Sequence, residues 1–212
     1  MAYVRQGSVD HLVYAVSDLD AGIAQIERLL GVRAVPGGRH SGRGTHNALI
    51  SLGGGAYLEI IAPDPGQSAP EMPRPFGLDR QREPRLVTWA ARVPDIEHRA
   101  EQARAAGYDP GVVLEMSRRL PNGDELRWEL SANLELPGDG IVPFLIQWEP
   151  GPHPSESAPT GARLADLEAE HPRPDVVGVM LQALGVELTV TESARPALIA
   201  TIEGPNGTVV LT

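Results

Sequence analysis

Hydrophobic and polar positions follow one order in three segments of the chain. Each segment opens with a short alternating strand, continues with an amphipathic helix that ends at a glycine, and then gives short strands separated by glycine turns. The helix-ending glycines are Gly31, Gly107 and Gly185, where a positive φ is easily adopted. The opening strands are expected at residues 9–16, 85–93 and 162–170. This order predicts an α+β fold made of repeated βαβββ modules.

The repeat also predicts the organisation of the chain. The first module is expected at residues 1–75, the second at 76–150 and a third, βαβββ-like module at 162–212. A polar, proline-containing stretch without periodicity, 151–161, is expected to be a linker. The long irregular segment 63–77 is either a spacer or a cover over a site. Asp18 or Asp20 is expected to cap the first helix, and residues 121–123 to form a turn between two strands.

Alternation along the first module places His11 and Glu59 on one face of the sheet. Successive side chains of a strand point to opposite faces, and the apolar members of each pair are expected on the face that the helix covers. Tyr57 shares the open face with these two residues. The residues expected on the helix-covered face are Leu12, Tyr14, Val16, Leu58 and Ile60.

The same reasoning assigns faces in the second module. The residues expected on its helix-covered face are Val87, Trp89, Ala91, Val93, Leu126, Trp128, Leu130, Phe144, Ile146 and Trp148. Those expected on the open face are Leu86, Thr88, Ala90, Arg92, Arg127, Glu129, Ser131, Leu145, Gln147 and Glu149. An open face that carries ionisable groups is wet, paired across two sheets, or used to hold an ion or polar ligand, because isolated buried charges are costly.

Glu59 is the most informative of these residues. It lies inside an apolar strand without a neighbouring Lys or Arg, which favours a functional role over a solvent-facing one. His11 by itself is also compatible with a hydrogen bond near the start of a strand. Arg127 and Glu129 are most simply a pair on an exposed face. His46 and Asn47 are ambiguous in their facing.

Composition narrows the classes of function. Eighteen basic and 28 acidic residues give a net charge of −10, and the chain has no basic run, which excludes a phosphate-tracking nucleic-acid binder and an anionic membrane partner. The absence of cysteine excludes disulfides, thiolate catalysis and sulfur-ligated metals. No apolar run approaches 18 residues, so a cytoplasmic location is expected.

Three stretches of the first module resemble the vicinal oxygen chelate superfamily, and within it the glyoxalase-like domain proteins. They read DHLVYAVSDLDAG, GGRHSGRGTHNALISLG and AYLEIIAPDP. The resemblance covers residues 8–65 best, 85–150 less well and 162–212 weakly. It implies a cupped mixed sheet of the glyoxalase and bleomycin-resistance type, in which metal ligands come from the first and last strands of each module.

The resemblance also implies a metal site and roles for individual residues. His11 and Glu59 match the two ligands of the first module. In the second, Thr88 matches the position of His11 and is a poor ligand, while Gln147 is the best match to Glu59. His46, Glu129 or Glu149 would then complete the ligand set. The ion would be Mn, Fe, Ni, Co or Zn.

The function implied is a divalent-metal-dependent enzyme acting on a small substrate with vicinal oxygens, of lyase, isomerase or dioxygenase type. Glu59 or Glu129 would move the proton, and the residues expected to bind substrate are His46, Asn47, Tyr57 and Arg127. The alternative is a metal-free small-molecule binding or drug-sequestering protein of the same fold, and a structural role comes third. The expected partners are a small molecule and, in a homodimer, a second copy of the chain.

Overall fold

A computed structural model describes residues 9–119, 125–133 and 135–212, and the turn expected at 121–123 lies outside them. The first module comprises β1 (Val9–Ala15), α1 (Leu19–Leu30), β2 (Val35–His40), β3 (Thr45–Gly53), β4 (Ala56–Pro63) and the 3₁₀ turn η1 (Pro75–Arg80). The second comprises β5 (Arg85–Arg92), α2 (Ile96–Ala105), β6 (Val112–Arg119), β7 (Glu125–Ala132), η2 (Pro137–Gly140) and β8 (Phe144–Trp148). The remainder comprises α3 (Pro154–Ser157), β9 (Arg163–His171), α4 (Pro174–Ala183), β10 (Thr189–Glu192), β11 (Ala197–Gly204) and β12 (Gly207–Leu211).

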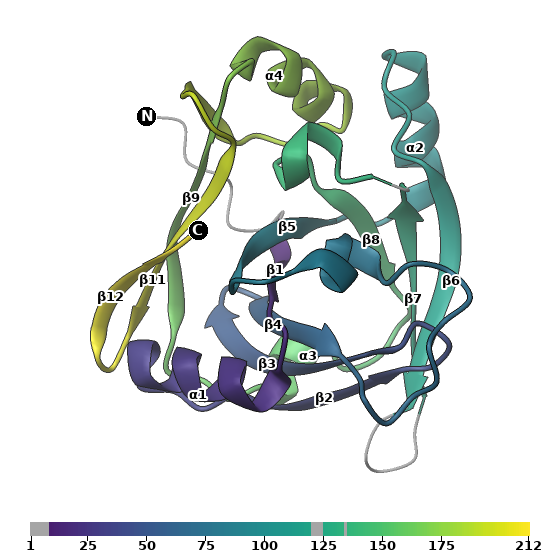
Figure 1. The fold of residues 1–212 in the computed structure, drawn as a ribbon. Helices are drawn as coiled ribbons and strands as arrows, with labels where there is room; N and C mark the ends of the chain where they lie inside the picture. Colours follow the sequence, from purple (N-terminus) through teal and green to yellow (C-terminus); the bar gives the residue numbers. More distant parts are fainter. Residues whose placement is uncertain (1–8, 120–124, 134) are drawn as a thin grey trace.

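The first two modules form one eight-stranded sheet in the order β2-β3-β4-β1-β5-β8-β7-β6. Within each module the first strand is parallel to the last, β1 to β4 and β5 to β8, and the modules join where β1 and β5 pair antiparallel. The sheet curls until its edge strands β2 and β6 contact each other, which makes a deep cup (Figure 1). The predicted α+β fold with a cupped mixed sheet is confirmed.

The third module repeats the order of elements but not their pairing. Its four-stranded sheet has the order β10-β9-β11-β12, and the opening strand β9 is parallel to β10 rather than to the last strand. Hydrophobic periodicity predicts which segments are strands and helices, whereas strand pairing depends on contacts that are distant in sequence. All three modules therefore share the order of elements, but only the first two share the strand pairing.

The second sheet packs on the outside of the cup. One hydrophobic cluster joins Leu12, Ile26 and Trp89 of the first two modules to Leu167 and Ile202 of the third. In Figure 1 the second sheet stands at the left, beside α1. Asn206 reaches the end of α1, where its Nδ2 donates to the carbonyl of Arg28 at 3.0 Å. The third module thus covers the face opposite to the cup interior.

The ends of α1 follow the sequence expectation. Asp18 is the N-cap, and its Oδ1 accepts a hydrogen bond from the amide of Ala21 at 2.8 Å. Gly31 ends the helix with φ of 76°. Among the described residues, no helix has the length and apolar character needed to cross a bilayer.

The faces assigned in the second module are partly wrong. Trp89 and Ala91 face the outer core as expected, but a bulge in the pairing of β5 with β1 turns Val87 into the cup and Leu86 outward. On β7 and β8 the expectation is inverted. Leu126, Trp128 and Ile146 cluster with Ala90 inside the cup, while Leu145 packs in the outer core. In β8 both faces are apolar, so alternation could not distinguish them. In β7 the alternation is clear, but its apolar face lines the cup instead of meeting the helix.

Two irregular segments pack against the cup. In the expected linker, α3 lies against β3, the carbonyl of Pro159 accepts from the amide of Ser51 at 2.9 Å, and Ala158 is buried beside Tyr57. In η1, Leu78 and Phe76 pack on Val13, Ala15 and Ile61, which line the inside of the cup. Of the two readings for segment 63–77, the structure therefore supports a cover.

The bulge at Val87 depends on a close approach by Gly140. Gly140 has φ of 94°, and a Cβ there would lie 1.9 Å from the carbonyl oxygen of Val87. Gly107 has nearly the same φ, 92°, with no atom within 4 Å of its position for a Cβ. We expect Gly107→Ala to cost about 1–2 kcal/mol of unfolding free energy through backbone strain alone, and Gly140→Ala to cost clearly more. Urea denaturation measures both, and equal losses would contradict the proposed contact.

Candidate functional site

The site begins with a buried carboxylate, Asp10, at a register shift between β1 and β5. Its Oδ1 accepts from His11 Nδ1 at 2.7 Å. Its Oδ2 accepts from Arg92 Nε at 2.7 Å, Trp148 Nε1 at 2.9 Å and His153 Nε2 at 3.1 Å. Burial by itself would raise the pKa of Asp10, but the hydrogen bonds and charges of His11 and His153 hold it far below its ordinary value. Asp10 is therefore an ionised, fully bonded anchor.

The hydrogen bond to Asp10 fixes the orientation of the His11 ring. Because Nδ1 donates its hydrogen to Asp10, Nε2 is the ring nitrogen that faces the cup. Tyr57 stacks on the imidazole with ring centroids 4.6 Å apart, and Phe144 meets it edge-on at 5.5 Å. Burial raises the pKa of Tyr57 well above its ordinary value, and the charges of Asp10 and Glu59 raise it further, so the phenol stays neutral. The imidazole is held in both orientation and tautomer.

Glu59 of β4 is a diagonal neighbour of His11 on the adjacent strand, and both side chains face the cup. Its Oε2 lies 3.7 Å from His11 Nε2, and only 6% of the residue is exposed. Its Oε1 accepts a hydrogen bond from Asn47 Nδ2 on β3. The structure thus brings together His11, Glu59 and Asn47, and it places Tyr57 beside them.

A second imidazole, which the sequence analysis missed, completes this group. His40, at the end of β2, has Nε2 3.9 Å from Glu59 Oε1 and Nδ1 2.9 Å from Thr45 Oγ1. Burial lowers the pKa of His40, although the charge of Glu59 opposes that effect, so its neutral form is favoured. The pairing of β2 with β3 brings His40 opposite Thr45. The only signal in the sequence was a histidine beside a glycine-rich turn.

Arg118 is the other residue that the sequence analysis missed. It lies on β6, is 6% exposed, and donates from one terminal nitrogen to Asn47 Oδ1 at 3.3 Å. Its Nε is buried and has no hydrogen-bond partner in the described part of the chain. Arg118 meets Asn47 because the curled sheet brings β6 next to β2, a closure that local sequence patterns do not reveal.

Most candidate site residues of the second module lie outside the cup. The expectation that Gln147 faces the cup is wrong: its Oε1 accepts from the amide of Ile96 at 2.7 Å, at the start of α2. Glu129 is the cross-strand partner of Gln147 and so shares its outward face. Arg127 is exposed and pairs with Glu125, and Glu149 is also exposed. Thr88 does face the cup, opposite Val13. For Gln147 the outward face supplies a partner, because the amide of Ile96 in the first turn of α2 is free to donate.

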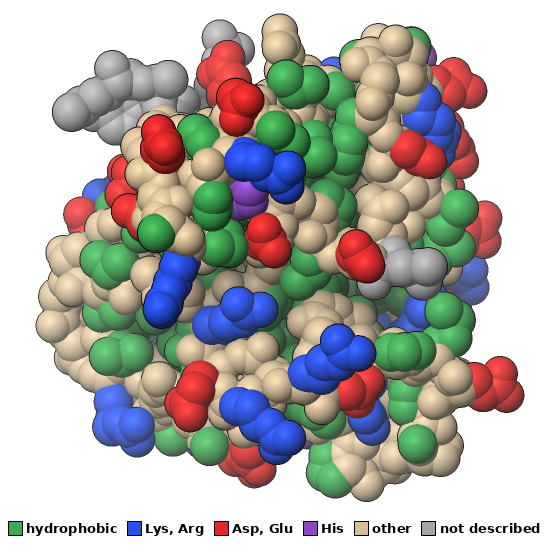
Figure 2. Space-filling model, turned by 45° about the horizontal axis from the view of Figure 1, so that its top comes forward, with side chains coloured by type: hydrophobic (Ala, Val, Ile, Leu, Met, Phe, Trp, Pro, Cys, Tyr) green, Lys and Arg blue, Asp and Glu red, His purple; other side chains and the backbone are tan. Residues whose placement is uncertain are grey.

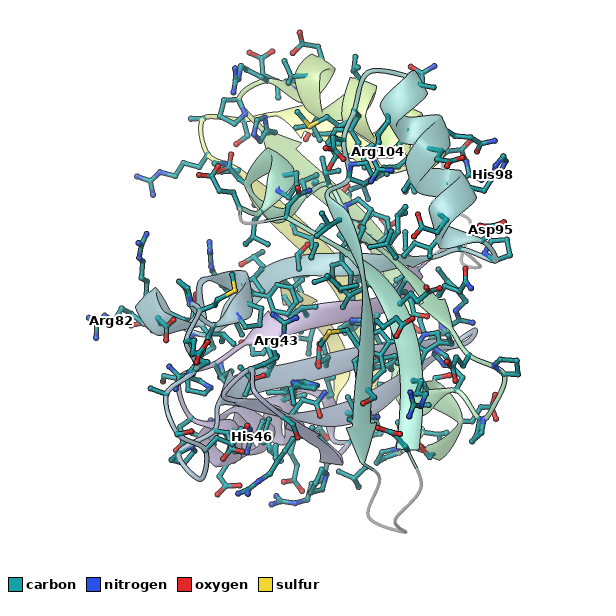
Figure 3. All side chains as sticks on the ribbon, turned by 90° about the vertical axis from the view of Figure 1, so that its right-hand side faces the viewer. Arg43, His46, Arg82, Asp95, His98 and Arg104 are labelled. Atoms are coloured by element: carbon teal, nitrogen blue, oxygen red, sulfur yellow. The ribbon has the colours of Figure 1, made fainter. Side chains whose placement is uncertain are left out.

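His46 is also separated from the group. It lies on β3 directly before Asn47, so its side chain points to the face opposite to that of Asn47. Figure 3 shows it at the periphery of the sheet, well apart from Arg43. His46 therefore does not meet Glu59, whereas Asn47 does.

The donor set fits a metal only in part. Within residues 9–119, 125–133 and 135–212, no three His, Asp or Glu side chains are grouped as ligands of one ion. The pair that converges is His11 Nε2 and Glu59 Oε2, two potential ligand atoms 3.7 Å apart, which is beyond hydrogen-bond distance. Metal–ligand bonds of about 2.0–2.2 Å allow two ligands of one ion to lie at such a separation.

A separate groove of about 570 Å³ lies between η2 and α4. Tyr108, Arg173 and Met180 line it, and there His171 Nε2 donates to Asp139 at 3.1 Å. It shares no residue with the His11–Glu59 group. Figure 2 shows acidic, arginine and hydrophobic side chains interspersed on one face of the molecule, in keeping with the excess of acidic residues.

Two βαβββ modules joined into one cupped sheet define the vicinal oxygen chelate class of proteins. The chain belongs to the glyoxalase-like domain family, whose sequence profile matches residues 9–185. The comparison with curated proteins found no match.

The chain is similar to several solved structures, and the first of these shares its fold. A hypothetical protein from Staphylococcus aureus superposes with a TM-score of 0.61 at 15% identity, covering 95% of this chain and 83% of that one. Methylmalonyl-CoA epimerase from Mycobacterium tuberculosis superposes with a TM-score of 0.44 at 25% identity, covering 72% and 92%. A variant of the Streptomyces coelicolor epimerase, in complex with 2-nitronate-propionyl-CoA, gives 0.44 at 22%, covering 69% and 98%.

Replacing Asp10 tests the anchor of the site. A pKa held below the ordinary 3.8 means that ionised Asp10 stabilises the fold above that pH, and that the stabilisation is lost as pH falls through the lower folded-state value. We expect Asp10→Asn to lower the unfolding free energy by about 3 kcal/mol at pH 7, because it breaks a buried charged network. The loss should shrink as the pH is lowered below 3.8, as urea denaturation measures.

Asp18→Asn is the matched control for this experiment. Asp18 is exposed and caps α1, and Asn caps a helix about as well as Asp. Its unfolding free energy should stay close to that of the wild type. A loss for Asp10→Asn that is the same at pH 7 and at low pH would contradict an ionised Asp10.

Proposed function

We propose that the protein is an enzyme that holds a divalent cation between His11 and Glu59 and acts on a small substrate with two neighbouring oxygens. The observation that carries this proposal is the approach of His11 Nε2 to Glu59 Oε2 at 3.7 Å, in a buried place. This separation is too long for a hydrogen bond and suits two ligands of one cation, for which imidazole nitrogen and carboxylate oxygen are common donors.

The surroundings of His11 support the same conclusion. Asp10 accepts its Nδ1 hydrogen, and a carboxylate behind a histidine is the usual partner of a metal-binding imidazole because it fixes the tautomer. An imidazole and a carboxylate suit Mn, Fe, Ni, Co or Zn. With two protein ligands, positions remain for two oxygens of a substrate or for water.

The residues around the pair define a proton-transfer site. A bound cation would act as a Lewis acid toward a substrate oxygen. Asn47 holds Glu59 Oε1, while His40 stands beside that oxygen in its neutral form, ready to accept a proton. Glu129 is not in reach. A base next to the ligand pair favours a lyase or isomerase over a dioxygenase.

Aromatic side chains would exclude water from the reaction. Tyr57 and Phe144 flank His11, and Phe76 of η1 stacks on Phe144 with centroids 5.8 Å apart. Phe76 has φ of 59°, a left-handed conformation that a bulky residue rarely adopts. Substrate entry would therefore require η1 to move, and the strained Phe76 is the place where that movement costs least.

A metal-free binding protein is the second candidate. The second module contributes Ala90, Trp128 and Ile146 to the cup, an apolar wall without a metal ligand. Such a wall suits retention of an apolar small molecule without turnover. Metal content distinguishes the two candidates.

Metal analysis of protein purified without chelators tests the proposal. We expect the wild type to carry a divalent metal close to one equivalent, and His11→Ala and Glu59→Gln to lose most of it, because each removes one of two protein ligands. His98→Ala is the matched control: it removes an imidazole that Figure 3 shows on the outside of α2, and it should keep the metal. Only trace metal in the wild type would favour the binding protein, and retention of the metal by both site variants would contradict His11 and Glu59 as its ligands.

A further inference from the structure

Arg118 carries a buried charge that the described protein does not neutralise directly. None of the ion pairs formed within the described residues includes it. Within the described residues its hydrogen bond goes to Asn47 Oδ1, and its Nε has no partner there. Arg92, on the same sheet, is bonded to both Asp10 and the carbonyl of Gly55. A buried guanidinium left unsatisfied is costly, so this site suits an anionic partner that the described residues do not supply.

The close packing around Arg118 depends on Gly37 of β2. A Cβ at Gly37 would lie 2.4 Å from Asn47 Oδ1 and 2.6 Å from a terminal nitrogen of Arg118. Asn47 in turn donates to Glu59, so one amide touches both the guanidinium and the proposed metal ligand. Arg118 is thereby held at the same end of the cup as the His11–Glu59 pair.

A second guanidinium faces the same wall. Arg43, in the turn between β2 and β3, donates to Met116 Sδ at 3.5 Å, and Met116 precedes Arg118 by two residues on the same face of β6. Figure 3 shows Arg43 close to β6, in contrast to Arg82, which extends into solvent. The potential at this end of the cup favours an anion.

The neighbouring surface is apolar and aromatic. Met116 packs with the cluster of Trp128 and Ile146 on the second module's side of the cup. An anionic group bound at Arg118 would therefore be attached to a hydrophobic body. A carboxylate on such a body suits a guanidinium, because Nε and a terminal nitrogen form a planar fork for its two oxygens.

We propose that Arg118, positioned by Asn47, binds the carboxylate of an organic substrate whose apolar body lies along Met116, Trp128 and Ile146. This inference deepens the proposed function and rests on it for the reaction, but the carboxylate site itself needs no metal. It can therefore be tested separately.

Titration of metal-free protein with benzoate and benzamide tests the carboxylate site. The two probes have nearly the same shape and differ in charge, so we expect benzoate to bind at least tenfold more tightly. Arg118→Met should abolish this preference with little change in the melting temperature, because the substitution relieves the unpartnered Nε and gives up only the long bond to Asn47. A merely structural Arg118 would instead lower the melting temperature and leave the preference intact.

The controls separate this site from general charge effects. Arg127→Met removes an exposed arginine from β7 and should keep the benzoate preference. Arg118→Lys retains the charge without the fork and should weaken benzoate several-fold, which gives a readout even where Arg118→Met fails to fold. Equal binding of the two probes, binding of neither, unchanged affinity in Arg118→Lys, or equally tight binding of inorganic phosphate would overturn the proposal. All these measurements use chelator-treated protein, so an absence of metal in the native protein leaves them unaffected.

Discussion

The hydrogen-bonded carboxylate of Asp10 is the constraint on which the site depends. A buried ionised group persists only where donors surround it. Asp10 obtains them from His11 on its own strand, Arg92 on β5, Trp148 on β8 and His153 before α3. One side chain therefore joins both modules and the connection that follows them. Because the same carboxylate accepts the Nδ1 hydrogen of His11, the fold and the orientation of the candidate ligand have a common origin.

The two modules have similar topologies and different interiors. The first turns a carboxylate, an amide and two imidazoles into the cup, whereas the second turns Ala90, Trp128 and Ile146 into it. The polar half fits ion binding and proton transfer, and the apolar half fits the body of a ligand. Arg118 is the exception in the second half, and the closure of the sheet brings it to Asn47. The third module covers the outer face, where it stabilises the sheet without entering the cup.

Sequence patterns predicted the first module well for a physical reason. One charged residue, Glu59, interrupts an otherwise apolar strand, so alternation placed it and His11 on the same face, and the two do approach each other. In β8, Leu145 and Ile146 point to opposite faces and both are buried, so their apolar character did not show which face lines the cup. The bulge at Val87 shifted the alternation by one residue. His40 and Arg118 join the group through strand pairing and closure of the sheet, which no local spacing encodes.

The central claim is that the side chains of His11 and Glu59 converge and bind one cation between them. Anomalous diffraction from crystals grown with Mn²⁺ would test it most directly. The account predicts a peak about 2.0–2.3 Å from both His11 Nε2 and a Glu59 oxygen. A peak at the groove of Asp139 and His171 instead, or no peak between His11 and Glu59 at saturating Mn²⁺, would contradict it.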